Sequence, residues 1–363
     1  MNKKHIQKIF YKLDAWLILG ISTLAIISIL CLYSSKNNWQ LPINQLIRVM
    51  IGFLAMLITA NISPQNWYKL APWLYCLGVI LLLGVEFMGH IGKGAQRWLN
   101  LGFIKFEPSE LMKLALPLAL SWWFHQRPFP RNVKPILISV IIIAIPAVLI
   151  LKQPDLGTAL LIISVASSLI FLAGIDKKWV IITIALTAIS IPLIWQNLHT
   201  YQQQRVLTFI NPEHDPLGAG YHIIQSKIAI GSGGLWGKGW LNGTQAHLNF
   251  LPEHTTDFIF ALFAEEFGFI GALILLSVCL GIIFRMSHMT LCAQSTFKRL
   301  LSASITIMFS ITCIVNIGMV TGVLPVVGVP LTFISYGGSS ILTMMSAFGI
   351  VMSIYNNRDL MTH

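Results

Sequence analysis

Residues 249–271 read NFLPEHTTDFIFALFAEEFGFIG, and in this stretch a polar segment passes into a long hydrophobic run. One carboxylate, Asp257, stands where the hydrophobic run begins, and two more, Glu265 and Glu266, stand inside it. Acidic side chains within a membrane-spanning segment are energetically costly, so they are treated as functional unless a partner explains them. The stretch therefore predicts a membrane helix that carries a polar site near its first turn.

The composition of the whole chain agrees with a membrane protein. Of 363 residues, 55% are hydrophobic and only 10% are charged, whereas soluble domains carry about 25% charged residues. The net charge of +11 comes from Lys and Arg in short loops, which is typical of cytoplasmic loops, so no nucleic-acid partner is expected. The five cysteines are scattered without CxxC spacing, which argues against a disulfide framework and a structural zinc site.

Hydrophobic segments recur along the chain at the length that crosses a bilayer, about 17–25 residues. We count ten of them, at 16–33, 46–62, 71–88, 108–124, 136–151, 158–173, 180–195, 258–283, 300–320 and 340–355. The first lacks a cleavage signal and is interpreted as an uncleaved helix. The sequence thus predicts an all-α integral membrane protein with about ten transmembrane helices, forming a single domain over residues 1–363.

The distribution of basic residues predicts the orientation. With the N-terminus inside, most of the 24 Lys and Arg residues fall on the cytoplasmic side, so we expect both termini in the cytoplasm. The loops with distinctive sequence then lie outside, at 89–107, 152–157, 196–257 and 321–339. The large extracytoplasmic loop 196–257, between helices seven and eight, is predicted to be functional because long structureless loops are uncommon.

Asp257 is expected to point into the helix bundle. At about 100° per residue, small residues fall on its side of the helix, and such a stripe lets membrane helices pack closely. These are Ala261, Ala264, Gly268 and Gly271. The alternative is a carboxylate that only complements the helix dipole, with Thr255 or Thr256 as the cap. Glu265 and Glu266 are predicted to be buried structural partners and not further catalytic acids.

Charged residues outside this stretch form two further groups. Glu110 and Lys113 are one turn apart after Pro108, so they can form an ion pair that either holds the helix or shapes a cavity. Cations on the predicted outer side could hold an anionic lipid headgroup, although Arg97 suits interfacial anchoring equally well. These substrate-binding candidates are Arg97, Lys105, Lys152 and Arg205.

Two other site types find little support. The glycine-rich run at 231–239 fails the phosphate-binding Walker A pattern and is interpreted as a bent, closely packed loop. Nothing in the sequence has metal-ligand spacing, so no metal site is predicted, and a divalent cation remains open only as a supplement to the basic residues.

Five stretches, at 94–115, 152–160, 215–240, 251–268 and 324–340, together resemble the SEDS family of polytopic cell-wall proteins. They stand in the family's order and run through most of the chain from residue 94 onward. The GTQ at 243–245, leading into the opening stretch, is more similar to the family's rod-shape, cell-elongation branch than to its division branch. One departure is Thr255-Thr256, where family members often have His-Thr.

The resemblance implies a peptidoglycan glycosyltransferase that polymerises lipid II at the outer face of the bacterial cytoplasmic membrane. It implies that Asp257 is the catalytic residue, and we expect it to act as general base with undecaprenyl pyrophosphate as the leaving group. It also implies a class B penicillin-binding protein as partner, alongside other membrane proteins of the elongation complex. The alternatives are a lipid II flippase or transporter and a non-catalytic scaffold of that complex.

Overall fold

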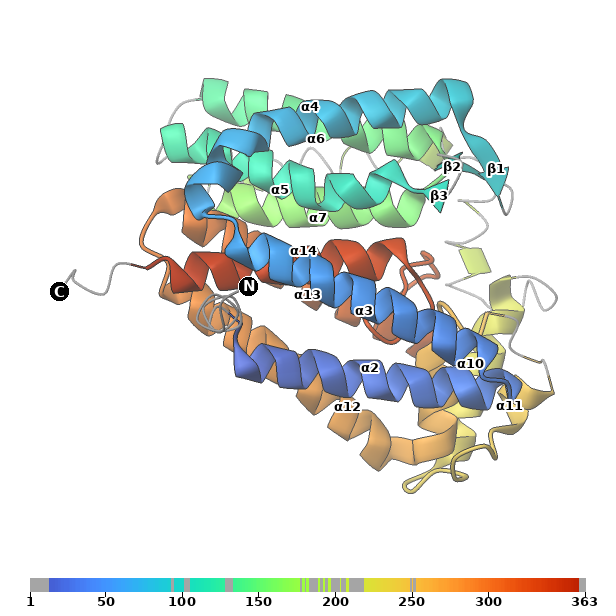
Figure 1. Cartoon of the computed structure of the whole chain (residues 1–363). Helices are drawn as coiled ribbons and strands as arrows, with labels where there is room; N and C mark the ends of the chain where they lie inside the picture. The colour runs from blue at the N-terminus through green and yellow to red at the C-terminus, as the bar shows by residue number, and fades with distance from the viewer. Residues whose placement is uncertain are drawn as a thin grey trace.

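The structure is a computed structural model that describes residues 13–92, 95–100, 105–127, 133–176, 219–248 and 253–358, together with Phe250 and scattered positions between 178 and 208. Helices account for nearly all of it, and they run roughly side by side in a bundle (Figure 1). The bundle has one end where α2 begins and α14 ends, and an opposite end that carries the short strands together with α10 and α11 (Figure 1).

The elements follow in chain order. They are α2 (Ala15–Lys36), α3 (Gln40–Asn61), α4 (Pro64–Met88), β1 (His90–Gly92), β2 (Ala95–Asn100), β3 (Lys105–Phe106), α5 (Pro108–Gln126), α6 (Val133–Lys152), α7 (Leu156–Leu172), α10 (Ala219–Gly233), α11 (Thr244–His247), α12 (Ile259–Leu291), α13 (Thr296–Thr321) and α14 (Ser339–Asn356). Every predicted apolar segment coincides with one of these helices except 180–195, most of which lies outside the described residues.

The predicted membrane class is confirmed. Seven helices in the described part of the chain are long and apolar enough to cross a membrane, namely α2, α3, α4, α6, α12, α13 and α14. The apolar helix α7 is shorter, at 17 residues. Many large apolar side chains on these helices are exposed, as a lipid-facing surface requires, while the buried ones form one core.

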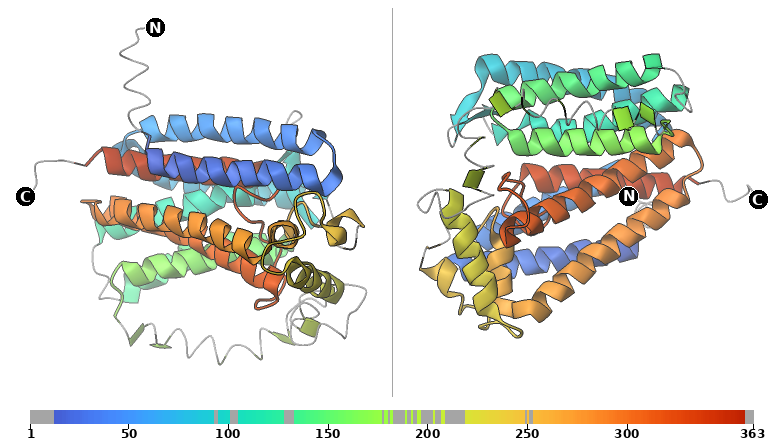
Figure 2. Two further views of the ribbon diagram at one scale, coloured as in Figure 1. Left: turned by 90° about the horizontal axis from the view of Figure 1, so that it is seen from below. Right: turned by 180° about the vertical axis from the view of Figure 1, so that it is seen from behind.

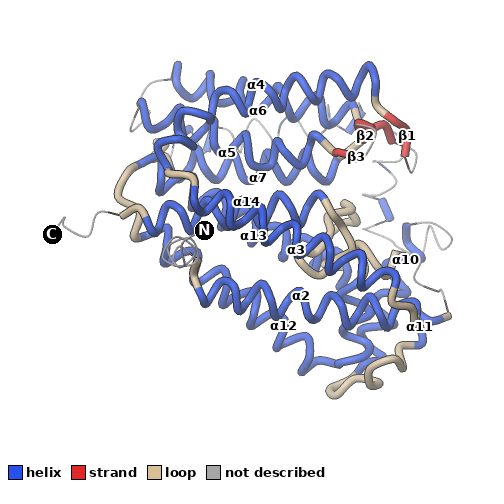
Figure 3. Tube along the Cα trace, viewed as in Figure 1, coloured by secondary structure: helices blue, strands red, loops and turns tan. Residues whose placement is uncertain are grey.

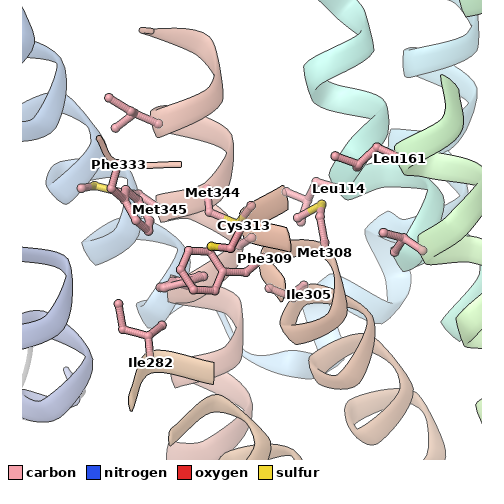
Figure 4. Packing of buried hydrophobic residues seen from close by; sticks show 14 of the residues in the cluster. Leu114, Leu161, Ile282, Ile305, Met308, Phe309, Cys313, Phe333, Met344 and Met345 are labelled. Atoms are coloured by element: carbon pink, nitrogen blue, oxygen red, sulfur yellow. The ribbon is translucent and has the colours of Figure 1, made fainter. Parts of the chain in front are cut away.

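The core joins α13, α14 and the segment between them. The rings of Phe309 on α13, Phe333 in the connecting segment and Phe348 on α14 contact one another, with centroids 5.4–6.1 Å apart. All three are fully buried, and Met345 lies close to Phe333 (Figure 4). This aromatic cluster fixes the connecting segment 322–338 against the bundle, and that segment forms one wall of the site described below.

A small β-sheet in residues 89–107 was not predicted from the sequence. Strands β1, β2 and β3 pair antiparallel in that order, at the same end of the molecule as α10 and α11 (Figure 3). The strands are only three, six and two residues long, too short to produce a recognisable alternation of polar and apolar residues. The sheet supplies hydrogen-bond partners for a backbone that would otherwise lack them.

Helix α12 is broken at Gly268, which has φ 68° and ψ −165°. The break leaves main-chain groups without helical partners, and residues 234–239 satisfy them. Glu265 O and Glu266 O accept from the N–H groups of Lys238 and Gly239, both at 3.0 Å. The N–H groups of Phe269 and Ile270 donate to Gly234 O and Leu235 O, at 2.9 and 3.2 Å. We call residues 234–239, which pair with α12 at its break, the 234–239 latch. The helix that precedes the latch, α10, lies beside α12 (Figure 2).

The break corrects one step of the sequence argument. A stripe at 100° per residue assumes a continuous helix, so Gly268 and Gly271 cannot be assigned to the face of Asp257. Gly268 is buried for a different reason. A Cβ there would lie 2.3 Å from Gly237 N, so glycine permits both the positive φ and the close approach of the latch.

Candidate functional site

Asp257 lies in the turn 253–258, two residues before α12 begins, which agrees with the predicted loop end at 257; it therefore has no helical face of the kind that the sequence argument assigned to it. Phe258 occupies the N-cap position and makes no side-chain cap hydrogen bond. The Thr256 hydroxyl donates instead to Glu253 Oε2, at 2.6 Å. Neither Thr255 nor Thr256 therefore caps α12, which was the capping part of the alternative considered from the sequence.

Three contacts from distant parts of the chain hold this turn. Asn316 Nδ2 on α13 donates to Asp257 O at 2.9 Å and to Val329 O at 2.8 Å. Ser335 Oγ donates to Thr256 O at 2.7 Å, and Tyr336 N donates to Thr255 O at 2.9 Å. Because consecutive carbonyl groups of residues 255–257 are all engaged, the backbone that carries Asp257 is fixed while its side chain stays half-buried.

The Asp257 carboxylate faces the segment 327–329. A Cβ built on Gly328, where φ is 76°, would lie 3.5 Å from Asp257 Oδ2. The same segment also lies close to α7, because a Cβ on Gly157 would lie 2.4 Å from Val327 O. Segment 327–329 is thus close both to Gly157, at the end of the motif KQPDLG (152–157), and to the Asp257 carboxylate.

Glu110 and Lys113 form the ion pair that their spacing predicts, with Lys113 Nζ 2.8 Å from Glu110 Oε1. Both side chains are about one-tenth exposed or less. They line a cavity of about 20 Å³, room for roughly one water, together with Val329 and Pro330. The structure therefore supports both roles that the sequence left open, since the pair joins one turn of α5 and also borders a cavity next to residues 327–329.

The candidate cations are used in different ways. Arg97 donates to Gln153 O at 3.3 Å and to Pro154 O, and its guanidinium lies 3.6 Å from the Asp155 carboxylate. Asp155 in turn caps α7 by accepting from Thr158 N at 3.2 Å. Arg97 thus holds the turn before α7, and about a third of its side chain remains exposed.

The other three candidates are less informative. Lys152 lies 3.4 Å from Glu86 Oε1 on the surface, with both side chains well exposed. Lys105 belongs to β3, but its side chain lies outside the described residues, as does all of Arg205. Within the described part of the chain, no group of three or more His, Cys, Asp and Glu side chains is placed to hold a metal ion.

Glu107, directly before α5, was missed by the sequence analysis. Burial, together with the nearby Glu110 carboxylate, raises the pKa of Glu107 to about 7. Ser109 Oγ donates to Glu107 Oε1 at 2.9 Å. The available signal was a second acid three residues before Glu110, in the spacing that places like charges together.

The pair inside the hydrophobic run is structural, as predicted. Glu265 is fully buried and accepts from Lys238 Nζ at 2.6 Å, from Thr244 N at 2.8 Å and Thr244 Oγ1 at 2.9 Å, and from Gln245 N. Glu266 is buried beside α2 and accepts from Ser34 Oγ. Glu265 thus binds α12 to Lys238 of the latch and to Thr244, and Glu266 binds α12 to α2.

Arg48 on α3 is a second residue that the sequence analysis did not single out. Its guanidinium lies over the ring of Tyr336, 4.0 Å from the centroid, next to the segment that holds residues 255 and 256. A lone cation inside an apolar run gave the only sequence signal.

Comparisons with known proteins show which family and which relatives this chain is similar to. The family model FTSW_RODA_SPOVE, described as "Cell cycle protein", matches residues 7–360. A protein of Escherichia coli K12 named peptidoglycan glycosyltransferase MrdB is 44% identical over 352 residues, covering 96% of this chain and 95% of its own. A protein of Helicobacter pylori with the same name is 37% identical over 358 residues, covering 96% and 91%.

Solved structures match over nearly the whole chain as well. One, entitled "Structural coordination of polymerization and crosslinking by a peptidoglycan synthase complex", superposes with a TM-score of 0.83 at 31% identity, covering 96% of this chain and 98% of that one. The crystal structure of the Thermus thermophilus rod shape determining protein RodA gives a TM-score of 0.72 at 26% identity, covering 95% and 97%.

Proposed function

This chain belongs to the FtsW, RodA and SpoVE family of cell cycle proteins and is a peptidoglycan glycosyltransferase, and we propose that Asp257 is the general base of its reaction. The acceptor's GlcNAc 4-hydroxyl loses its proton to the Asp257 carboxylate as the oxygen attacks the anomeric carbon of the donor's MurNAc. The bond from that carbon to the pyrophosphate breaks, and undecaprenyl pyrophosphate leaves with the electron pair. A positioned carboxylate suits this step because it accepts the proton as the new bond forms.

One observation carries the proposal. The half-buried Asp257 side chain projects from a backbone that Asn316, Ser335 and Tyr336 hold in place. A general base has to be accessible to substrate and fixed in position, and this arrangement provides both. Of the other three acids in the opening stretch, Glu265 and Glu266 are buried and engaged in structural contacts, and Glu253 accepts from the Thr256 hydroxyl.

The leaving pyrophosphate requires positive charge nearby. We assign this role to the candidate cations Arg97, Lys105, Lys152 and Arg205, with a divalent cation as a possible supplement. Arg97 supports the idea through its partly exposed guanidinium, although that group also holds the turn 153–155. The Glu110–Lys113 pair is proposed to shape the cavity beside residues 327–329 without touching the reacting atoms.

The protein is a multi-pass protein of the bacterial inner membrane. We propose that both termini face the cytoplasm and that Asp257 works on the outer side, as the basic residues predict. The proposed partner is a class B penicillin-binding protein, with other elongation-complex membrane proteins around it. This proposal is supported by the similarity of the chain to the solved peptidoglycan synthase complex described above, in which polymerisation and crosslinking are coordinated.

The test uses the full-length protein and purified lipid II. Asp257→Asn keeps the shape of the side chain and removes the base, so glycan polymerisation should fall by about 10²–10⁴-fold while the protein stays folded. The matched control is Asp176→Asn, which changes an exposed carboxylate far along the chain and should leave the rate unchanged. Polymerisation by Asp257→Asn at near wild-type rate would refute the assignment.

The same preparations separate the enzyme from the flippase and scaffold alternatives. In liposomes with dye-labelled lipid II, an enzyme makes polymer without translocating the dye, whereas a flippase translocates it without polymer. In cells lacking the wild-type protein, Asp257→Asn should fail to restore growth and rod shape; restoration would favour the scaffold.

A further inference from the structure

Arg48 is a cation within a membrane helix and has no anionic partner among the described residues. It lies eight residues after the start of α3, about 12 Å along the helix axis. The neighbouring side chains Ile47, Met50 and Ile51 are all more than half exposed, as lipid-facing residues are. A charged group at this depth is expensive, and it is found where a partner or a ligand compensates it.

The surroundings of Arg48 hold its guanidinium without neutralising it. The group stacks on the Tyr336 ring at 4.0 Å, and its stem packs against Gly338, where a Cβ would lie 3.4 Å from Arg48 Nε. A cation–π contact occupies the flat face of a guanidinium and leaves its N–H groups, which lie in the plane, available to an acceptor. Across the part of the chain that the structure describes, no carboxylate forms an ion pair with Arg48.

Arg48 is joined to the Asp257 turn through one residue. Tyr336, whose ring carries the guanidinium, donates its backbone N–H to Thr255 O at 2.9 Å. The preceding residue, Ser335, donates to Thr256 O at 2.7 Å and accepts at its own carbonyl from Gln45 Nε2 on α3, at 3.1 Å. The segment 335–336 therefore touches α3 with one side and the turn that bears the proposed base with the other.

We propose that Arg48 binds a lipid-borne phosphate, and that the ligand is the pyrophosphate of the polyprenyl-linked substrate or product. This rests on the proposed function only for the identity of that lipid. Guanidinium groups bind phosphate oxygens in pairs, and here the anion's hydrocarbon tail can remain against the exposed apolar face of α3. Arg48 is thus a binding residue beside the site, and Asp257 carries out the proton transfer.

The experiment measures equilibrium binding to the full-length protein in detergent, using undecaprenyl pyrophosphate and undecaprenol as probes. Undecaprenyl pyrophosphate is the proposed product, so it is not consumed and the result does not depend on Asp257. Arg48→Gln should weaken its binding about tenfold, the loss expected for a charge-assisted hydrogen-bond pair, and leave undecaprenol binding unchanged. Arg48→Lys, which keeps the charge, should recover part of the affinity.

The matched control is Lys36→Gln, which removes an exposed positive charge at the end of α2 on the same side of the molecule. It should change neither probe's affinity by more than about twofold. Competition with phosphatidylglycerol vesicles identifies the source of the phosphate: displacement of the probe from wild type but not from Arg48→Gln assigns the site to a phospholipid headgroup. Equal affinity of folded wild type and Arg48→Gln for undecaprenyl pyrophosphate overturns the proposal, whatever Asp257→Asn does to catalysis.

Discussion

At the scale of single residues, Gly328 lies next to the Asp257 carboxylate. It has φ 76°, and a Cβ would lie 3.5 Å from Asp257 Oδ2. In Gly328→Ala the added methyl group would stand against the Asp257 carboxylate, so the rate of lipid II polymerisation should fall. The free energy of unfolding should fall by only about 1–2 kcal/mol, the cost of the left-handed backbone for alanine. The control is Gly234→Ala, which also has a positive φ but open space around it. Thermal unfolding measures the loss of stability in both variants, and a polymerisation assay measures the loss of activity. Equal polymerisation rates for Gly328→Ala and Gly234→Ala would show that Gly328 does not shape the site.

Glu107 gives the protein a predicted pH dependence. Its pKa is about 7, above the ordinary 4.5, because burial and Glu110 favour the protonated form in the fold. The folded state then binds more protons than the unfolded state between these values, so stability falls as the pH rises from about 4.5 to 7. Glu107→Gln should raise the melting temperature at pH 8 and leave it unchanged near pH 4.5. A shift of equal size at every pH would contradict this explanation.

At the scale of elements, the break in α12 depends on glycine. A Cβ at Gly268 would lie 2.3 Å from Gly237 N and 2.7 Å from Leu235 O, and its φ is 68°. Gly268→Ala should therefore displace the latch and destabilise the protein by several kcal/mol. The control stands on the same helix: Gly281 has nothing within 4 Å, so Gly281→Ala should be neutral or stabilise by up to about 1 kcal/mol. Unfolding midpoints in detergent test both, and similar values for the two variants would exclude the latch as a structural requirement.

The ion pair between Lys238 and Glu265 also holds the latch against α12. Glu265 is fully buried, and Lys238 Nζ lies 2.6 Å from it. Lys238→Gln leaves a buried carboxylate without its cation, which typically costs about 3–5 kcal/mol. The double variant Lys238→Gln/Glu265→Gln should be more stable than Lys238→Gln alone, because the uncompensated charge is gone. A double-mutant cycle on the unfolding midpoint measures this coupling, and additive losses would mean that the pair does not interact.

The sequence predicted most helices of the described structure, because a bilayer demands long apolar runs and few other patterns produce them. It missed the break at Gly268, since two more glycines, Gly271 and Gly281, follow in the same run and only contact with residues 234–239 distinguishes Gly268. It singled out Asp257 from the rarity of acids in apolar surroundings but assigned it a helical face, because the contacts of Asn316 and Ser335 with the turn come from far away in the chain and leave no local pattern. Arg48 was missed because its contact with Tyr336, a residue far away in the chain, is not visible in the local sequence.

At the scale of the whole molecule, the arrangement of the helices predicts which turns face each compartment. The turn at Cys292, between α12 and α13, lies at the opposite end of α13 from Val323, which is 70% exposed. In intact cells, a membrane-impermeant maleimide should label Val323→Cys in a variant lacking the native cysteines. It should fail to label a variant whose single cysteine is Cys292 until the membrane is permeabilised. The reverse pattern would invert the proposed orientation.

The latch has a consequence for how the chain enters the membrane. Four main-chain groups at the break in α12 find their partners in residues 234–239, so hydrocarbon would leave these groups unsatisfied if α12 were inserted alone. Residues 234–239 must therefore pack against α12 before the hydrogen bonds at its break are complete, so the earlier segment cannot reach its final structure until the later one has been synthesised. The same dependence sets the boundaries for recombination between relatives: a crossover between residues 240 and 258 separates the two halves of the break, whereas a crossover in the turn after Leu291 keeps them together.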